Sequence, residues 1–73
     1  MDKEVKIDTE YISLSNLLQI GDIVSTGGQA KLIIQDNLVK VNGEVCTQRS
    51  KKIYPGDNVH VLLEPQTKLT VVN

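Results

Sequence analysis

The stretch STGGQAKLIIQDNLVKVNGEVCTQRSKKIYPGD, residues 25–57, decides the fold, because its pattern of apolar residues changes at Leu38. Before Leu38, the apolar residues Ala30, Ile33 and Ile34 lie on one stripe of a helix. After it, valines alternate with polar residues, as they do in a strand that buries one face. The stretch therefore predicts a helix followed by β-structure.

Both ends of this helix carry sequence signals. Thr26 and Gln29 have the spacing of a capping box, in which each side chain binds the other residue's backbone amide. Leu32 should widen the apolar stripe, and the turn formers Asp36 and Asn37 should end the helix. We therefore expect a helix that begins at the capping box and ends at Asp36 and Asn37.

Two tight turns are predicted within the β-structure. Asn42 and Gly43 predict a hairpin, because a type I′ turn needs positive φ at both central positions. Residues 54–57, Tyr-Pro-Gly-Asp, predict a type II turn, in which proline presets φ and glycine takes the positive value. The β-structure should therefore be mostly antiparallel.

The flanking residues extend this pattern at both ends. Residues 3–8 alternate apolar and charged side chains and predict a first strand. Leucines at helical spacing predict a helix over residues 14–20, which a left-handed cap at Gly21 should end. Alternation over residues 59–63 and the apolar run at 69–72 predict the last two strands.

The composition limits the function classes. A chain of 73 residues with 40% hydrophobic and 23% charged side chains is typical of one small soluble domain, so we expect residues 1–73 to form a single domain. Its one cysteine, Cys46, and one histidine, His60, provide neither an intramolecular disulfide nor a set of metal ligands. His60 lies in an apolar strand without a neighbouring nucleophile, so we expect no catalytic site, metal or cofactor.

The charge is unevenly distributed although the net charge is only −1. Residues 31–52 carry five basic against two acidic side chains, a local charge of +3, whereas residues 1–10 sum to −2. Because salt screens exposed charges beyond about 8 to 10 Å, a polyanion would respond to the local patch. With neither a signal-peptide run nor a membrane span in the sequence, we expect a cytoplasmic monomer without membrane contact.

Several short motifs occur in a defined order along residues 11–63. They are Ile12-Ser13-Leu14, Gly27-Gly28-Gln29-Ala30-Lys31, Val41-Asn42-Gly43, Arg49-Ser50-Lys51-Lys52 and Pro55-Gly56-Asp57. In this order and spacing they resemble the S-four-like RNA-binding domain, also called the αL motif, and most closely its freestanding bacterial members, the YaaA-like or YbcJ-like subgroup. The resemblance implies an α+β fold, with two short N-terminal helices packed on a small, mostly antiparallel β-sheet and a strand added at each end.

The resemblance also implies a function and its residues. It implies a non-catalytic module that binds structured RNA, in particular ribosomal RNA, through a basic face, in ribosome assembly or quality control. The candidate RNA-binding residues are Lys31, Arg49, Lys51, Lys52, Gln29 and Lys40. Lys31 is near a helix start, where free amides and the helix dipole attract phosphate. Arg49, Lys51 and Lys52 should lie in a loop that is free to follow a phosphate backbone.

Other interpretations of these residues remain open. The basic cluster is also compatible with a solvated loop, and Gly27-Gly28 indicates a tight turn more than a phosphate cradle. Only Tyr11 and Tyr54 could stack on a base, which argues against a platform that stacks successive bases. The alternative function is a protein interaction module that adds an edge strand to a partner's sheet. Steep salt dependence would distinguish RNA binding from that alternative.

Overall fold

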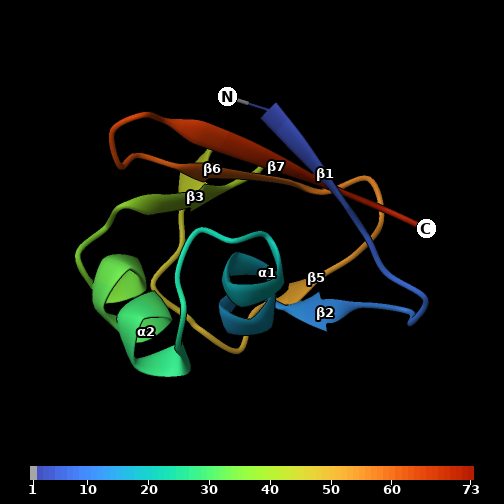
Figure 1. The fold of residues 1–73 in the computed structure, drawn as a ribbon, viewed down its shortest axis with the longest axis horizontal. Helices are drawn as coiled ribbons and strands as arrows, with labels where there is room; N and C mark the ends of the chain where they lie inside the picture. The colour runs from blue at the N-terminus through green and yellow to red at the C-terminus, as the bar shows by residue number, and fades with distance from the viewer. Residues whose placement is uncertain (1) are drawn as a thin grey trace.

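The computed structural model describes residues 2–73, which form two helices and seven strands (Figure 1). In chain order these are β1 (Asp2–Lys6), β2 (Ile12–Ser13), α1 (Leu14–Ile20), α2 (Gly27–Gln35), β3 (Val39–Val41), β4 (Glu44–Val45), β5 (Lys52–Ile53), β6 (Asn58–Val61) and β7 (Thr67–Val72). The predicted first and last strands are thus shifted by one or two residues, and both predicted helices are present.

The strands form two sheets on either side of α1. The larger sheet has the order β1-β7-β6-β3-β4, in which β1 pairs with β7 in parallel and every other pair is antiparallel. The smaller sheet pairs β2 with β5, antiparallel. Figure 1 shows the larger sheet as one layer, with both helices and the small sheet below it. This arrangement confirms the predicted α+β fold with a mostly antiparallel sheet and added terminal strands.

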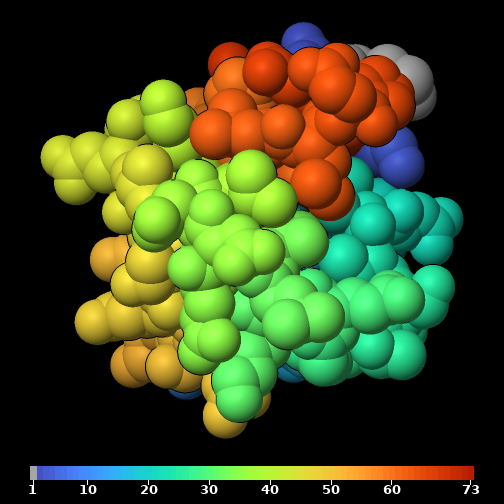
Figure 2. All heavy atoms as spheres, turned by 90° about the vertical axis from the view of Figure 1, so that its left-hand side faces the viewer, coloured from blue at the N-terminus to red at the C-terminus, as the bar shows by residue number. Residues whose placement is uncertain are grey.

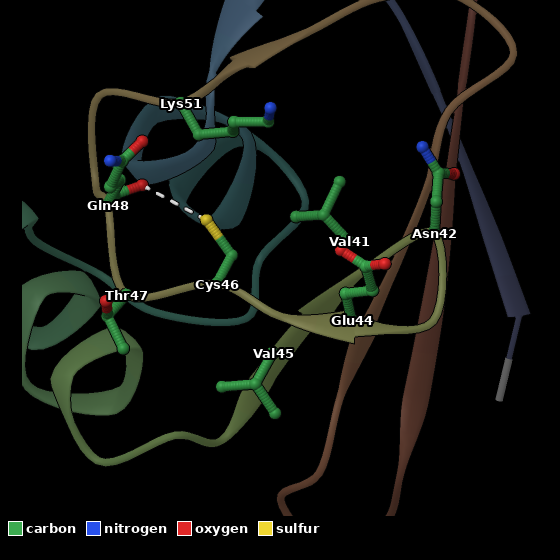
Figure 3. A pocket seen from close by; sticks show the side chains of 8 residues that line it. All are labelled: Val41, Asn42, Glu44, Val45, Cys46, Thr47, Gln48 and Lys51. Atoms are coloured by element: carbon green, nitrogen blue, oxygen red, sulfur yellow. Dashed lines mark hydrogen bonds between the residues drawn. The ribbon is translucent and has the colours of Figure 1, made fainter.

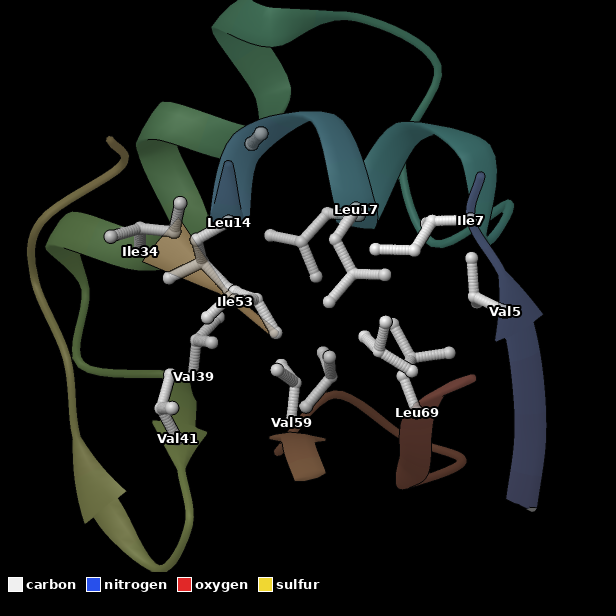
Figure 4. Packing of buried hydrophobic residues seen from close by; sticks show 14 residues of the cluster. Val5, Ile7, Leu14, Leu17, Ile34, Val39, Val41, Ile53, Val59 and Leu69 are labelled. Atoms are coloured by element: carbon white, nitrogen blue, oxygen red, sulfur yellow. The ribbon is translucent and has the colours of Figure 1, made fainter. Parts of the chain in front are cut away.

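The core lies between the helices and the inner face of the larger sheet (Figure 4). Leu14, Leu17 and Leu18 of α1 are fully buried, because their helical spacing places them on the face toward the sheet. Alternate residues of the strands meet them, among them Val59 of β6 and Leu69 of β7. The residues that alternate with these buried positions, for example in β1 and β7, point to the opposite face of the sheet.

The end of α1 differs from the prediction. Gly21 does follow the helix, but its φ is −81°, and the left-handed residue is Asp22 with φ 62°. A Cβ at Gly21 would lie 3.3 Å from both methyl carbons of Leu69 and 3.1 Å from the Leu17 carbonyl oxygen. A side chain at Gly21 would therefore need Leu69 or the Leu17 carbonyl to shift by a few tenths of an ångström, and the predicted left-handed cap at Gly21 was wrong.

The start of α2 confirms the cap at Thr26 and corrects its partner. Thr26 Oγ1 accepts a hydrogen bond from the Gln29 amide at 3.2 Å. Gln29 Oε1 accepts from the amide of Ser25 at 2.7 Å, one residue before the one expected for a capping box. Leu32 is 64% exposed, so it does not widen the buried stripe, whose most buried members are Ala30 and Ile34.

Both predicted tight turns are present, and they contact each other. Asn42 and Gly43 have φ of 51° and 89°, and Gly56 has φ of 96°. Asn42 Nδ2 donates to Asp57 Oδ1 at 3.2 Å, and the second carboxylate oxygen of Asp57 accepts from the Tyr54 amide at 2.8 Å. The Asn-Gly and Pro-Gly-Asp motifs therefore stabilise one shared corner of the fold.

Candidate nucleic-acid interface

A groove of about 510 Å³ separates α2 from the segment that links β4 to β5. It is lined by Lys31, Ile34, Gln35, Thr47, Gln48, Arg49 and Ser50. Figure 2 shows the two elements side by side on one face, with α2 in green and the linking segment in yellow. Two of the lining residues are cationic and the others are polar or apolar, so the groove carries positive charge without an acidic lining residue.

The helical wall of the groove follows from residue spacing on α2. Lys31, Ile34 and Gln35 stand three and four residues apart, which places them on one side of the helix. Ile34 is fully buried and anchors this side to the core, whereas Lys31 and Gln35 are exposed. Lys31 is the fifth residue of α2, beyond the first-turn amides, so it contributes its own ammonium group to the groove rather than reinforcing the helix start.

The opposite wall is held by backbone hydrogen bonds. The Arg49 carbonyl accepts from the amide of Ser15 at 3.0 Å, and the Lys51 carbonyl accepts from the amide of Leu14 at 2.9 Å. These bonds tie the backbone of the basic segment to the first turn of α1, and Arg49 and Lys51 lie in the predicted loop between β4 and β5. The Arg49 and Lys51 side chains remain exposed. The groove therefore presents exposed cations from a backbone that is anchored to α1.

Lys51 lines a second groove of about 500 Å³ beside the first (Figure 3). Thr47 and Gln48 line both grooves, which makes the two neighbours. In the second groove the acidic Glu44 stands among the lining residues, and the Cys46 thiol donates to the Gln48 carbonyl at 3.7 Å. Its charge is therefore more balanced than that of the groove that holds Lys31 and Arg49.

Lys52 lies in strand β5 and not in a loop, contrary to the sequence prediction. It pairs with Ser13 of β2, and its Nζ lies 4.9 Å from the centroid of the Tyr11 ring. The strands β2 and β5 were not predicted from the sequence, because two residues are too few to show an alternating pattern. Their pairing is set by contacts between segments far apart in the chain.

Gln29 and Lys40, the remaining candidates, have other surroundings. The Gln29 side chain accepts from the Ser25 amide at the start of α2. Lys40 stands in β3 between the buried Val39 and Val41, so its side chain lies on the outer face of the sheet, away from the helices. The alternation of valines with Lys40 in the sequence already predicts this outward position. A contact of Lys40 with RNA remains a prediction, on a different face from Lys31 and Arg49.

The cations of the grooves have no partners within the part of the chain that the structure describes. Among residues 2–73, Lys31, Arg49 and Lys51 form no ion pair or side-chain hydrogen bond. Over the same residues no cluster of three histidine, cysteine or acidic side chains is placed to hold a metal ion, and neither helix has the length and apolar character to cross a membrane. Ser50 belongs to the basic motif, whereas Thr47 and Gln48, which also line the groove, carried no distinguishing signal in the sequence.

Comparisons with known proteins cover nearly the whole chain. The model of the S4 domain family matches residues 5–72. A curated relative from Bacillus subtilis (strain 168), described as "Probable ribosome maturation protein RlbA", is 38% identical over 61 residues. The matched part covers 84% of this chain and 86% of that protein. The relative therefore consists of little more than this domain, in agreement with the predicted resemblance to freestanding members.

Proposed function

Because the chain belongs to the S4 domain family, we propose that it is a non-catalytic module that binds structured ribosomal RNA as a monomer in the cytoplasm. The groove between α2 and the segment before β5, with Lys31 and Arg49 on its two walls, carries the proposal. The description of the relative as a ribosome maturation protein supports the link to the ribosome and a role in ribosome assembly.

The chemistry of the groove suits phosphate oxygens. The Arg49 guanidinium can donate two parallel hydrogen bonds to one phosphate, and the Lys31 ammonium supplies a second positive charge from the facing helix. Thr47, Gln48 and Ser50 add neutral donors between them. Contacts of this kind position an RNA by the path of its backbone and do not read its base sequence. We therefore expect recognition by RNA shape.

The backbone on both walls of the groove is anchored before RNA arrives. Ile34 packs α2 into the core, and the carbonyls of Arg49 and Lys51 bind the amides at the start of α1. A preformed site loses less conformational entropy on binding than a free loop would. We therefore expect RNA to bind without a large rearrangement of this face.

A charge-reversal experiment tests the proposal. The variant Arg49→Glu/Lys51→Glu should lose affinity for deproteinised bacterial ribosomal RNA, as measured by filter retention, by about 100-fold or more, because attractive phosphate contacts become repulsive. Its thermal stability should stay close to that of the wild type, since both side chains are exposed and unpaired.

The matched control is Lys6→Glu/Lys68→Glu. Both lysines are exposed on β1 and β7, and both point outward from the face of the sheet opposite the helices, the face that also holds Lys40. A loss of binding in this variant alone would place the RNA on that face and contradict the groove. Each double variant lowers the net charge of −1 by four, to −5. Equal losses for both variants would indicate diffuse electrostatic attraction without a site, and unchanged binding in both would contradict RNA binding by this chain. Salt-insensitive capture of a protein partner would instead support the edge-strand alternative.

A further inference from the structure

Tyr11 and Tyr54 meet on the surface although they are far apart in the sequence, which contains no phenylalanine or tryptophan. Their ring centroids are 5.7 Å apart, and the ring planes are inclined by 50°. Both side chains are 41% exposed, so part of each ring faces solvent. The Lys52 ammonium lies over the Tyr11 ring. Both tyrosine rings of the chain are thus gathered in one exposed cluster beside a cation.

The pairing of β2 with β5 produces this cluster. Ile12 pairs with Ile53 in antiparallel register, so the next position along places Tyr11 opposite Tyr54. Ile53 is fully buried, which directs its neighbours Lys52 and Tyr54 to the outer side of the strand. The side chains are therefore held by the sheet register.

The cluster adjoins the proposed RNA-binding face along the chain. Lys52 directly follows the segment that carries Arg49 and Lys51, and that segment is tied by its carbonyls to the start of α1. Tyr11 stands just before β2, which runs into the same helix. The tyrosine pair and the basic segment are therefore both anchored at the start of α1.

We infer that Tyr11, Tyr54 and Lys52 form a subsite for one unpaired nucleotide of the RNA, an inference that rests on the proposed function. The exposed ring surface stacks on the base, and the Lys52 ammonium contacts the phosphate of the same nucleotide. A base inside a continuous duplex has no free face, so the subsite selects structured RNA that carries a bulged or looped-out nucleotide. Two rings serve one nucleotide and do not make a platform for successive bases.

Two RNA hairpins that differ by one nucleotide test this inference. One hairpin is fully paired, and the other carries a single unpaired 2-aminopurine, an adenine analogue whose fluorescence is quenched when it stacks. The wild type should bind the bulged hairpin about 10-fold or more tightly than the paired one and should quench the analogue. A third hairpin with an abasic residue at the bulge keeps the phosphate and should lose this preference.

Protein variants assign the effect to the rings. Tyr54→Leu keeps apolar bulk without an aromatic ring and should lose the preference and the quenching, whereas Tyr54→Phe should retain both. Lys52→Ala should lower the steepness of the salt dependence by about 1 in log–log slope. Arg49→Glu/Lys51→Glu should weaken binding to both hairpins alike.

The outcomes separate this inference from the proposed function. Equal binding of the paired, bulged and abasic hairpins by the wild type, without quenching, would overturn the subsite and leave the groove intact. Retention of the preference by Tyr54→Leu would show that the tyrosines only pack β2 against the turn after β5. Failure of the wild type to bind any of the hairpins would overturn the inference and the proposed function together.

Discussion

Replacing Asp57 with alanine removes two hydrogen bonds at the corner where the two tight turns meet. Its carboxylate accepts from the Tyr54 amide at 2.8 Å and from Asn42 Nδ2 at 3.2 Å. The shorter bond has the length of a charge-assisted contact, and we assign it about 1 kcal/mol; the longer one contributes about 0.5 kcal/mol. Asp57→Ala should therefore lower the free energy of unfolding by about 1.5 kcal/mol. For a chain of this size that corresponds to a fall in Tm of about 6 to 12 °C.

The assay is thermal and urea unfolding followed by circular dichroism. The control Asp8→Ala removes the same charge from an exposed residue that forms no side-chain hydrogen bond within residues 2–73, and it should leave Tm nearly unchanged. A Tm for Asp57→Ala within about 2 °C of the wild type would refute the stabilising role of this corner.

A double-mutant cycle isolates the contact between the turns. Asn42→Gly keeps a residue that tolerates the φ of 51° while removing the side chain that donates to Asp57. The cycle of Asn42→Gly with Asp57→Ala should give a coupling free energy of about 0.5 to 1 kcal/mol. A coupling below about 0.3 kcal/mol would mean that the two turns are energetically independent.

Two further substitutions test the local structure. Thr26→Ala removes the oxygen that accepts from the Gln29 amide and should lower the free energy of unfolding by about 1 kcal/mol, whereas Thr26→Ser should lower it much less. Equal stability of the wild type and both variants in urea unfolding would exclude the cap. Gly43→Val should lower the free energy of unfolding by about 1 to 2 kcal/mol through backbone strain at φ 89°. Nothing lies within 4 Å of the added Cβ, so no steric clash contributes to this loss. Gly43→Asn should be milder, and a Val variant as stable as the Asn variant would contradict the strain argument.

Features that depend on a few neighbouring residues could be predicted from the sequence. The cap at Thr26 and the turns at Asn42-Gly43 and Gly56 each arise within about four residues, and all are present. The β2–β5 pairing joins Ile12 to Ile53 across most of the chain, and two-residue strands leave no periodic pattern. The prediction for Gly21 was wrong because Asp22 takes the left-handed conformation, and the approach of Leu69 to Gly21 is a contact that only the tertiary structure shows.

The candidate site was predictable in its residue types and less so in its geometry. The basic candidates were proposed from charge and motif. Their distribution over two neighbouring grooves, strand β5 and the outer sheet face depends on the packing of separate segments. Lys40 is the exception, since its position between two valines predicts a side chain that points away from the core. The meeting of Tyr11 with Tyr54 required the register of a pairing that the sequence did not reveal.

The most direct test of RNA binding through the basic face is the salt dependence of affinity for deproteinised ribosomal RNA. If three or four phosphates are neutralised, log K for the wild type should fall against log salt concentration with a slope of roughly −2 to −4. Arg49→Glu/Lys51→Glu should flatten this slope, and Lys6→Glu/Lys68→Glu should leave it unchanged. A wild-type affinity that does not change with salt, or equal slopes for the wild type and Arg49→Glu/Lys51→Glu, would contradict RNA binding through the basic face.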